Sequence, residues 1–191
     1  MTAGRAPRRK IILIGGSVRS GKSAFALALA RRLGPRRGFL ATAPPLDAEM
    51  CQRIAHHRAQ RGDDFTAVEE PTEVSAALRR MADTDVVVID CVTLWLSNLL
   101  VGEVPEPAIV ARVDELAATL KAVSFHVVLV TNEVGMGVHP EHALGRAFRD
   151  VAGRAHQRLA RCADEIYLAA LGVIIRLHPR PVEVQPFDDH P

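Results

Sequence analysis

Short continuous apolar runs recur along the chain, and between them hydrophobic residues repeat with the spacing of an amphipathic helix. Strands alternating with helices are typical of a parallel sheet that is buried on both faces. The runs predict strands at residues 11–14, 38–42, 65–70, 85–90 and 125–132. The periodic stretches predict helices over residues 24–33, 47–61, 71–81, 91–100, 108–121 and 140–162.

The C-terminal part follows a different pattern. Residues 165–171 and 173–177 predict two strands joined tightly around Gly172, and so an antiparallel edge on the parallel sheet. We expect one domain over residues 11–178, between a flexible basic tail at 1–10 and an irregular tail at 179–191. A chain of 191 residues with 48% hydrophobic content is large enough for one such core.

The stretch after the first predicted strand matches the phosphate-loop pattern G-x-x-x-x-G-K-[ST], with Gly16, Gly21, Lys22 and Ser23 at the specified positions. Glycines allow backbone N–H groups to surround phosphate oxygens, and the N-terminus of the next helix adds further donors. Lys22 is expected to bind the β- and γ-phosphates, and the Ser23 hydroxyl to bind Mg²⁺. The fold class is therefore a single-domain α/β P-loop NTPase fold.

Two acidic residues lie at the ends of predicted strands. Asp90 follows a buried run and is predicted to hold Mg²⁺ directly or through water; the alternative is a carboxylate that only ends the strand or caps a helix. Glu133 follows the strand at 125–132 and precedes Gly135 and Gly137. It is either a base, a partner of Mg²⁺-bound water, or an ordinary turn residue.

Composition narrows the class of protein. The formal net charge is only +2, with 24 basic and 22 acidic residues, so no overall field indicates nucleic-acid or membrane binding. The three cysteines fit neither a disulfide framework nor a C-x-x-C metal site, which favours the reducing cytoplasm. No apolar run is long enough to span a membrane.

The helix predicted at 47–61 carries two adjacent histidines. Asp47 has the character of an N-cap, and Met50, Ile54 and His57 fall on one face of the helix. His56 then points about 100° away, toward water or a cleft. From periodicity alone, either histidine is an ordinary solvated or hydrogen-bonded residue.

Beyond this generic fold, the chain resembles the bifunctional adenosylcobinamide kinase and adenosylcobinamide-phosphate guanylyltransferase family of cobalamin biosynthesis. The resemblance spans most of residues 11–172. It rests on the phosphate loop, Ala41-Thr42, the helix with Ile54-x-His56-His57-Arg58, Thr93 with Asn98-Leu99-Leu100, Glu133-Val134-Gly135-Met136-Gly137, and Phe148-Arg149-Asp150-x-x-Gly153-Arg154.

The resemblance implies two reactions and a set of site residues. ATP or GTP would phosphorylate the aminopropanol hydroxyl of adenosylcobinamide, and GMP from GTP would then be transferred to that phosphate, giving adenosylcobinamide-GDP and pyrophosphate. It also implies a RecA-like sheet, a homotrimer and a guanylylated histidine, here His56. The implied nucleotide contacts are Gly16, Ser17, Val18, Arg19, Ser20, Gly21, Lys22, Ser23, Thr42, Ala43, Pro44, His57, Arg58, Glu69 and Asp90.

The sequence departs from the family pattern in three places. Ser17 replaces the second glycine of the loop, His156 replaces an asparagine, and Ala43-Pro44-Pro45 is less polar than expected. Two other functions remain open: a P-loop small-molecule kinase without nucleotidyl transfer, and a GTP-binding regulatory module that does not turn nucleotide over.

Overall fold

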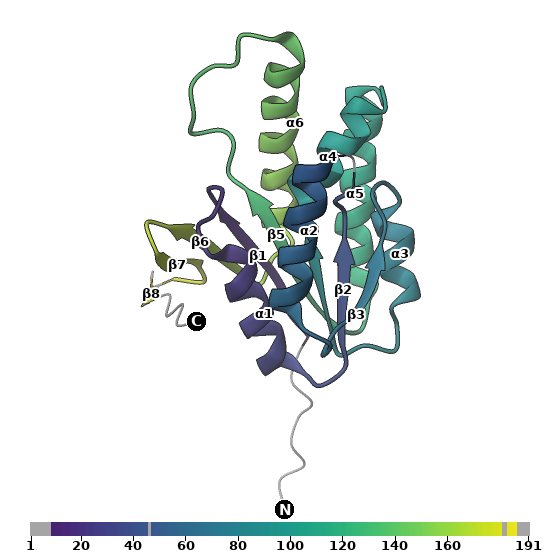
Figure 1. Cartoon of the computed structure of the whole chain (residues 1–191), viewed down its shortest axis with the longest axis vertical. Helices are drawn as coiled ribbons and strands as arrows, with labels where there is room; N and C mark the ends of the chain where they lie inside the picture. Colours follow the sequence, from purple (N-terminus) through teal and green to yellow (C-terminus); the bar gives the residue numbers. More distant parts are fainter. Residues whose placement is uncertain (1–8, 46, 181–182, 187–191) are drawn as a thin grey trace, which may run out of the picture.

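The computed structural model describes residues 9–45, 47–180 and 183–186, which form one eight-stranded sheet flanked by helices (Figure 1). The strand order is β3-β2-β4-β5-β1-β6-β7-β8. The strands are β1 (Ile11–Gly16), β2 (Arg37–Ala41), β3 (Thr66–Glu69), β4 (Val86–Asp90), β5 (His126–Asn132), β6 (Glu165–Ala170), β7 (Val173–His178) and β8 (Glu183–Pro186).

The helices agree with the periodic stretches of the sequence, with ends that differ by a few residues. They are α1 (Lys22–Leu33), α2 (Ala48–Arg61), α3 (Val74–Arg80), α4 (Val92–Val101), α5 (Glu106–Ala122) and α6 (Ala143–Ala160). Asp47 caps α2 as predicted, because its carboxylate accepts a 2.7 Å hydrogen bond from Met50 N. None of the described helices combines the length and apolarity that crossing a membrane requires.

Six neighbouring strands of the sheet, β3, β2, β4, β5, β1 and β6, run parallel to one another. In contrast, β7 pairs antiparallel with β6, and β8 pairs antiparallel with β7. The predicted antiparallel edge is therefore confirmed, with Leu171 and Gly172 at positive φ in the turn. The expectation of an irregular segment from residue 179 onward is wrong for residues 183–186, which form β8. The prolines of this segment argue against a strand when the sequence is considered alone. An edge strand such as β8 nevertheless tolerates proline better than a central strand does.

The N-terminal tail expected at 1–10 lies outside the described residues except for Arg9 and Lys10. Arg9 donates hydrogen bonds to the carbonyl oxygens of Leu120 and Lys121 at the end of α5. Lys10 forms a 2.6 Å ion pair with Glu165 of β6. These two residues are therefore attached to the domain, contrary to the expectation for the tail.

Alternate residues of the central strands point to opposite faces of the sheet and are buried in two separate hydrophobic cores. On one face, residues such as Ile11, Leu13 and Leu129 pack with α3, α4, α5 and α6. On the other face, Ile12 and Ile14 pack with residues of α1. Burial on both faces explains why these strands read as unbroken apolar runs.

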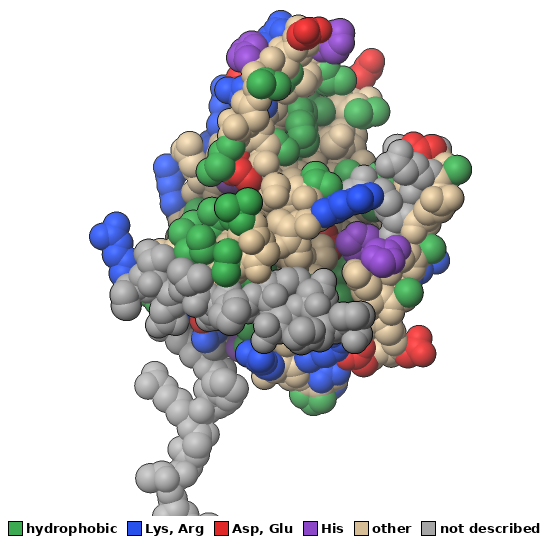
Figure 2. Space-filling model, turned by 60° about the vertical axis from the view of Figure 1, so that its left-hand side comes forward, with side chains coloured by type: hydrophobic (Ala, Val, Ile, Leu, Met, Phe, Trp, Pro, Cys, Tyr) green, Lys and Arg blue, Asp and Glu red, His purple; other side chains and the backbone are tan. Residues whose placement is uncertain are grey.

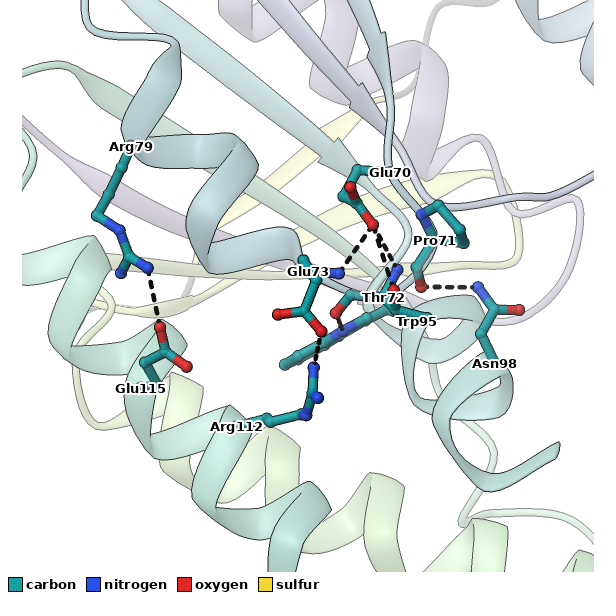
Figure 3. Close-up of polar contacts among 9 residues, drawn as sticks. All are labelled: Glu70, Pro71, Thr72, Glu73, Arg79, Trp95, Asn98, Arg112 and Glu115. Carbon is teal, nitrogen blue, oxygen red and sulfur yellow. Dashed lines mark hydrogen bonds and ion pairs between the residues drawn. The ribbon is translucent and has the colours of Figure 1, made fainter. Parts of the chain in front are cut away.

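Polar contacts join the helices on the first of these faces (Figure 3). Arg79 of α3 forms a 3.0 Å ion pair with Glu115 of α5, and Arg112 of α5 pairs with Glu73 before α3. The buried Trp95 donates its indole N–H to Thr72 O at 2.8 Å. This network fixes the loop after β3 against α4, close to the carboxyl edge of the sheet.

Candidate functional site

The phosphate loop connects β1 to α1 at the carboxyl edge of the parallel strands, where ligands of open α/β sheets bind (Figure 1). Gly21 has φ 86° and Arg19 has φ 56°, so both lie in the left-handed region. Lys22 is buried, and its ammonium donates a 2.9 Å hydrogen bond to Ser17 O across the loop. Ser17, Val18 and Arg19 are exposed at the tip of the loop.

Crowding explains the glycine at position 16. A Cβ atom there would lie 2.5 Å from Ala169 O and 2.8 Å from Ser20 Oγ. The side chain of Ser17 is exposed, so the replacement of the family's second glycine creates no comparable crowding. Ser20 Oγ is buried and has no hydrogen-bond partner among the described residues.

Ser23 and Asp90 meet beneath the loop. Burial raises the pKa of the Asp90 carboxyl, while a hydrogen bond from Ser23 and the charges of His57 and Lys22 act in the opposite direction. A hydroxyl and a carboxylate are hard oxygen donors of the kind Mg²⁺ prefers. The described residues contain no group of three or more His, Cys, Asp or Glu side chains arranged to hold a metal. Two protein donors fit Mg²⁺, which usually takes its remaining ligands from phosphates and water.

Thr42 is fully buried at the end of β2 and joins this strand to the turn after β4. Its hydroxyl donates to Cys91 O and accepts from Cys91 N, both at 2.8 Å. Its backbone N donates to Asp90 O, and its carbonyl accepts from the Asn98 amide at 2.8 Å. All its polar groups therefore contact protein, and a nucleotide contact from Thr42 stays a prediction.

Thr93, at the start of α4, extends this network to β5. Its hydroxyl lies 3.2 Å from Cys91 Sγ and accepts 3.2 Å hydrogen bonds from the backbone and side-chain nitrogens of Asn132. The Asn98 amide also donates to Pro71 O at 3.0 Å (Figure 3). The family motif contains Thr93 and Asn98, but sequence reasoning assigned them no role, because their partners lie 27 to 56 residues away.

Helix α2 presents its histidines on different sides. The rings of His56 and His57 are 6.3 Å apart between centroids, with His56 exposed and His57 half-buried. His57 lies near enough to Asp90 for its charge to lower the pKa of that carboxyl. Among the described side chains of α2, Arg61 alone is buried, so the helix is largely open to solvent. Figure 2 shows histidine side chains reaching the surface in the middle of one face of the molecule.

Arg58 of α2 and Glu69 of β3, two predicted nucleotide contacts, form an ion pair with each other. They line a hollow of about 400 Å³ together with Pro45, Cys51, Ile54 and Ala55. Ala43 and Pro44 are half-buried in the loop after β2, and the next residue, Pro45, lines this hollow. These four predicted nucleotide contacts, Ala43, Pro44, Arg58 and Glu69, therefore lie on the loop after β2, on α2 and on β3.

Glu133 follows β5, the neighbour of β1 in the sheet, and donates its backbone N–H to Gly16 O at 2.9 Å. One oxygen of its carboxylate accepts a 2.6 Å hydrogen bond from Gly135 N, and the other lies 3.8 Å from His156 Nδ1. His156 Nε2 is 2.7 Å from the hydroxyl of the buried Thr131. Sequence reasoning noted His156 only as a departure from the family and did not connect it with Glu133.

Solved structures confirm the RecA-like fold class. The RadB recombinase aligns with 92% of this chain and 86% of its own, at TM-score 0.51 and 13% identity. An ATPase domain of known structure aligns with 93% of this chain and 80% of its own, at TM-score 0.51 and 12% identity. At such low identity these similarities concern the fold alone.

Sequence comparisons are more specific. The family described as cobinamide kinase / cobinamide phosphate guanyltransferase matches residues 12–177. The bifunctional adenosylcobalamin biosynthesis proteins CobU of Escherichia coli and Salmonella typhimurium are 37% and 38% identical, each over 87% of this chain and 99% of their own lengths. CobP of Pseudomonas aeruginosa is 37% identical over 89% of this chain and 98% of its own. The chain therefore belongs to the cobinamide kinase / cobinamide phosphate guanyltransferase family.

Proposed function

We propose that this protein phosphorylates the aminopropanol hydroxyl of adenosylcobinamide with ATP or GTP, and then transfers GMP from GTP to the resulting phosphate. The products of the second reaction are adenosylcobinamide-GDP and pyrophosphate. The observation that carries the proposal is the match of residues 12–177 to a family with both activities, on a chain with an intact phosphate loop and an exposed His56.

In the proposed site, the backbone of residues 16–23 binds the phosphates, and Lys22 leaves Ser17 O to neutralise the β- and γ-phosphate charge. Ser23 and Asp90 would hold Mg²⁺, which neutralises charge on the phosphate oxygens when it is bound. Arg19, at the exposed tip of the loop, has the planar guanidinium suited to bidentate contacts with phosphate. The remaining predicted contacts, from Thr42 to Pro44 with His57, Arg58 and Glu69, would surround the rest of the nucleotide.

His56 is the proposed nucleophile of the second reaction. A neutral imidazole is available near pH 7 and attacks phosphorus without a strong base. Its nitrogen would bond to the α-phosphorus of GTP as the bond to pyrophosphate breaks, and the phosphate of the corrinoid would then displace the histidine. This requires His56 to meet a nucleotide held by Lys22 and Ser23.

We further propose that the protein acts in the cytoplasm as a homotrimer. The cytoplasm is supported by three cysteines that form no disulfide among the described residues. The trimer is supported only by the family resemblance, and sedimentation equilibrium of the purified protein tests it.

Incubation with Mg²⁺ and α-³²P-labelled GTP, followed by a denaturing gel, tests the guanylyl-histidine intermediate. We expect wild type to retain a label that acid removes and alkali does not, and His56→Ala to carry none. His139→Ala, which removes another exposed histidine, serves as the matched control and should label like wild type. An unlabelled wild type that binds GTP and still phosphorylates adenosylcobinamide would reduce the function to a kinase alone.

A further inference from the structure

We propose that Glu133 accepts the proton of the acceptor hydroxyl during phosphoryl transfer, and that His156 is a positioning residue for its carboxylate. This inference rests on the proposed kinase reaction and names a residue for its proton transfer. It concerns the carboxyl end of β5, the strand that lies next to β1 in the sheet, whereas His56 is carried by α2 between β2 and β3.

The backbone places Glu133 beside the phosphate loop. Strands β1 and β5 are parallel neighbours with Gly16 opposite Asn132, and Glu133 N donates to Gly16 O at 2.9 Å. The residue therefore follows the strand edge at the point where the loop begins. An acceptor hydroxyl in line with the γ-phosphate has to approach this edge of the sheet.

The two carboxylate oxygens of Glu133 have different surroundings. Oε1 is held by the 2.6 Å hydrogen bond from Gly135 N, and a Cβ atom at Gly135 would lie 2.8 Å from this oxygen. Oε2 lies 3.8 Å from His156 Nδ1, which is beyond hydrogen-bond distance. The side chain is 30% exposed, so the carboxylate is open to a substrate, and the hydrogen bond to Oε1 fixes its orientation. A role in the turn alone would use only Oε1.

His156 is itself held from behind. Its Nε2 is 2.7 Å from Thr131 Oγ1, and its side chain is 17% exposed on the face of α6 that packs against the sheet. Burial lowers the pKa of His156, with the Glu133 charge acting in the opposite direction, so the ring is neutral near pH 7. When the Thr131 hydroxyl donates to Nε2, the ring carries its proton on Nδ1, facing Glu133. The Nδ1–H group then faces Oε2 of Glu133 across 3.8 Å, where its dipole attracts the carboxylate charge.

The transfer forms one bond to phosphorus and breaks another. The hydroxyl oxygen forms a bond to the γ-phosphorus, and the bond from that phosphorus to the bridging oxygen of the leaving nucleoside diphosphate breaks. The hydroxyl proton passes to Glu133 Oε2 and from there to solvent. General base catalysis of this kind contributes about 10²–10⁴-fold to a rate.

The test compares Glu133→Gln with Glu141→Gln, which removes an exposed carboxylate from the same loop. The rate of ³²P transfer from γ-labelled ATP to adenosylcobinamide is measured beside the labelling of His56 by α-labelled GTP. We expect Glu133→Gln to lower kcat of phosphoryl transfer by about 10²-fold or more, with KM for ATP unchanged and labelling of His56 retained. His156→Leu, which removes the N–H donor, should lower kcat about tenfold, again without a change in KM, as expected of a positioning residue.

Other outcomes overturn the inference. Phosphoryl transfer by Glu133→Gln within threefold of Glu141→Gln would exclude Glu133 as the base. Equal loss of phosphoryl transfer and His56 labelling would show that Glu133 supports the nucleotide site as a whole. Wild type that labels His56 but leaves adenosylcobinamide unphosphorylated would refute the kinase half of the proposed function and this inference with it, whereas unchanged phosphoryl transfer by Glu133→Gln beside an active wild type would refute this inference alone.

Discussion

Replacing Thr42 with valine tests whether one hydroxyl holds the carboxyl ends of β2 and β4 together. Valine keeps the shape of threonine but can neither accept from Cys91 N nor donate to Cys91 O, both now 2.8 Å from Thr42 Oγ1. Cys91 is 4% exposed, so water cannot readily replace the lost partner. Leaving a buried polar group unpaired costs about 1–3 kcal/mol, and two such groups that partly relax cost about 3 kcal/mol.

Urea unfolding followed by circular dichroism measures this loss. We expect the free energy of unfolding of Thr42→Val to fall by about 3 kcal/mol, and its Tm by roughly 6–12 °C for a chain of this size. Thr66→Val is the matched control, because Thr66 is exposed in β3 and should change stability by less than about 0.5 kcal/mol. A loss below about 0.5 kcal/mol for Thr42→Val would refute the reasoning that this hydroxyl joins the two strands.

Three other side chains give further predictions. Lys22→Ala should lower kcat of phosphoryl transfer by about 10²-fold or more at unchanged circular dichroism, because it removes a charge aimed at the transferred phosphate; a loss below tenfold would contradict this. Hydrogen bonds from Glu73 N and Thr72 lower the pKa of Glu70 from 4.5, so this carboxylate adds stability above that pH. Acid unfolding curves should therefore show Glu70→Gln less stable than wild type above pH 4.5, with the difference vanishing as the pH falls through the lowered pKa. Burial raises the pKa of the Cys91 thiol to about 11, so at pH 8 a thiol reagent should modify the exposed Cys51 quickly and Cys91 only after unfolding.

Much of the architecture could be predicted from the chain alone. Residues buried on both faces of a parallel strand must be apolar, so β4 and β5 are visible as unbroken hydrophobic runs. The phosphate loop is equally visible, because a backbone that surrounds phosphate needs glycine and lysine at set positions. The strand β8 was missed because short edge strands carry no such burial requirement.

What the tertiary structure decided is which distant polar residues meet. Sequence spacing placed His56 and His57 on different sides of α2, but only the fold brings His57 near Asp90. The sequence places Thr42 at a strand end, but only the fold joins its polar groups to Cys91, Asp90 and Asn98.

The partnership of Glu133 with His156 shows the same division. The sequence marks Glu133 as a polar residue at a strand end, and His156 as one histidine within a long helix. Their distance of 3.8 Å depends on how α6 packs over β5, which brings together residues 23 positions apart. Local patterns determine elements because they reflect each residue's own burial and backbone preferences. Contacts between side chains on different elements depend on packing geometry, which no local pattern contains.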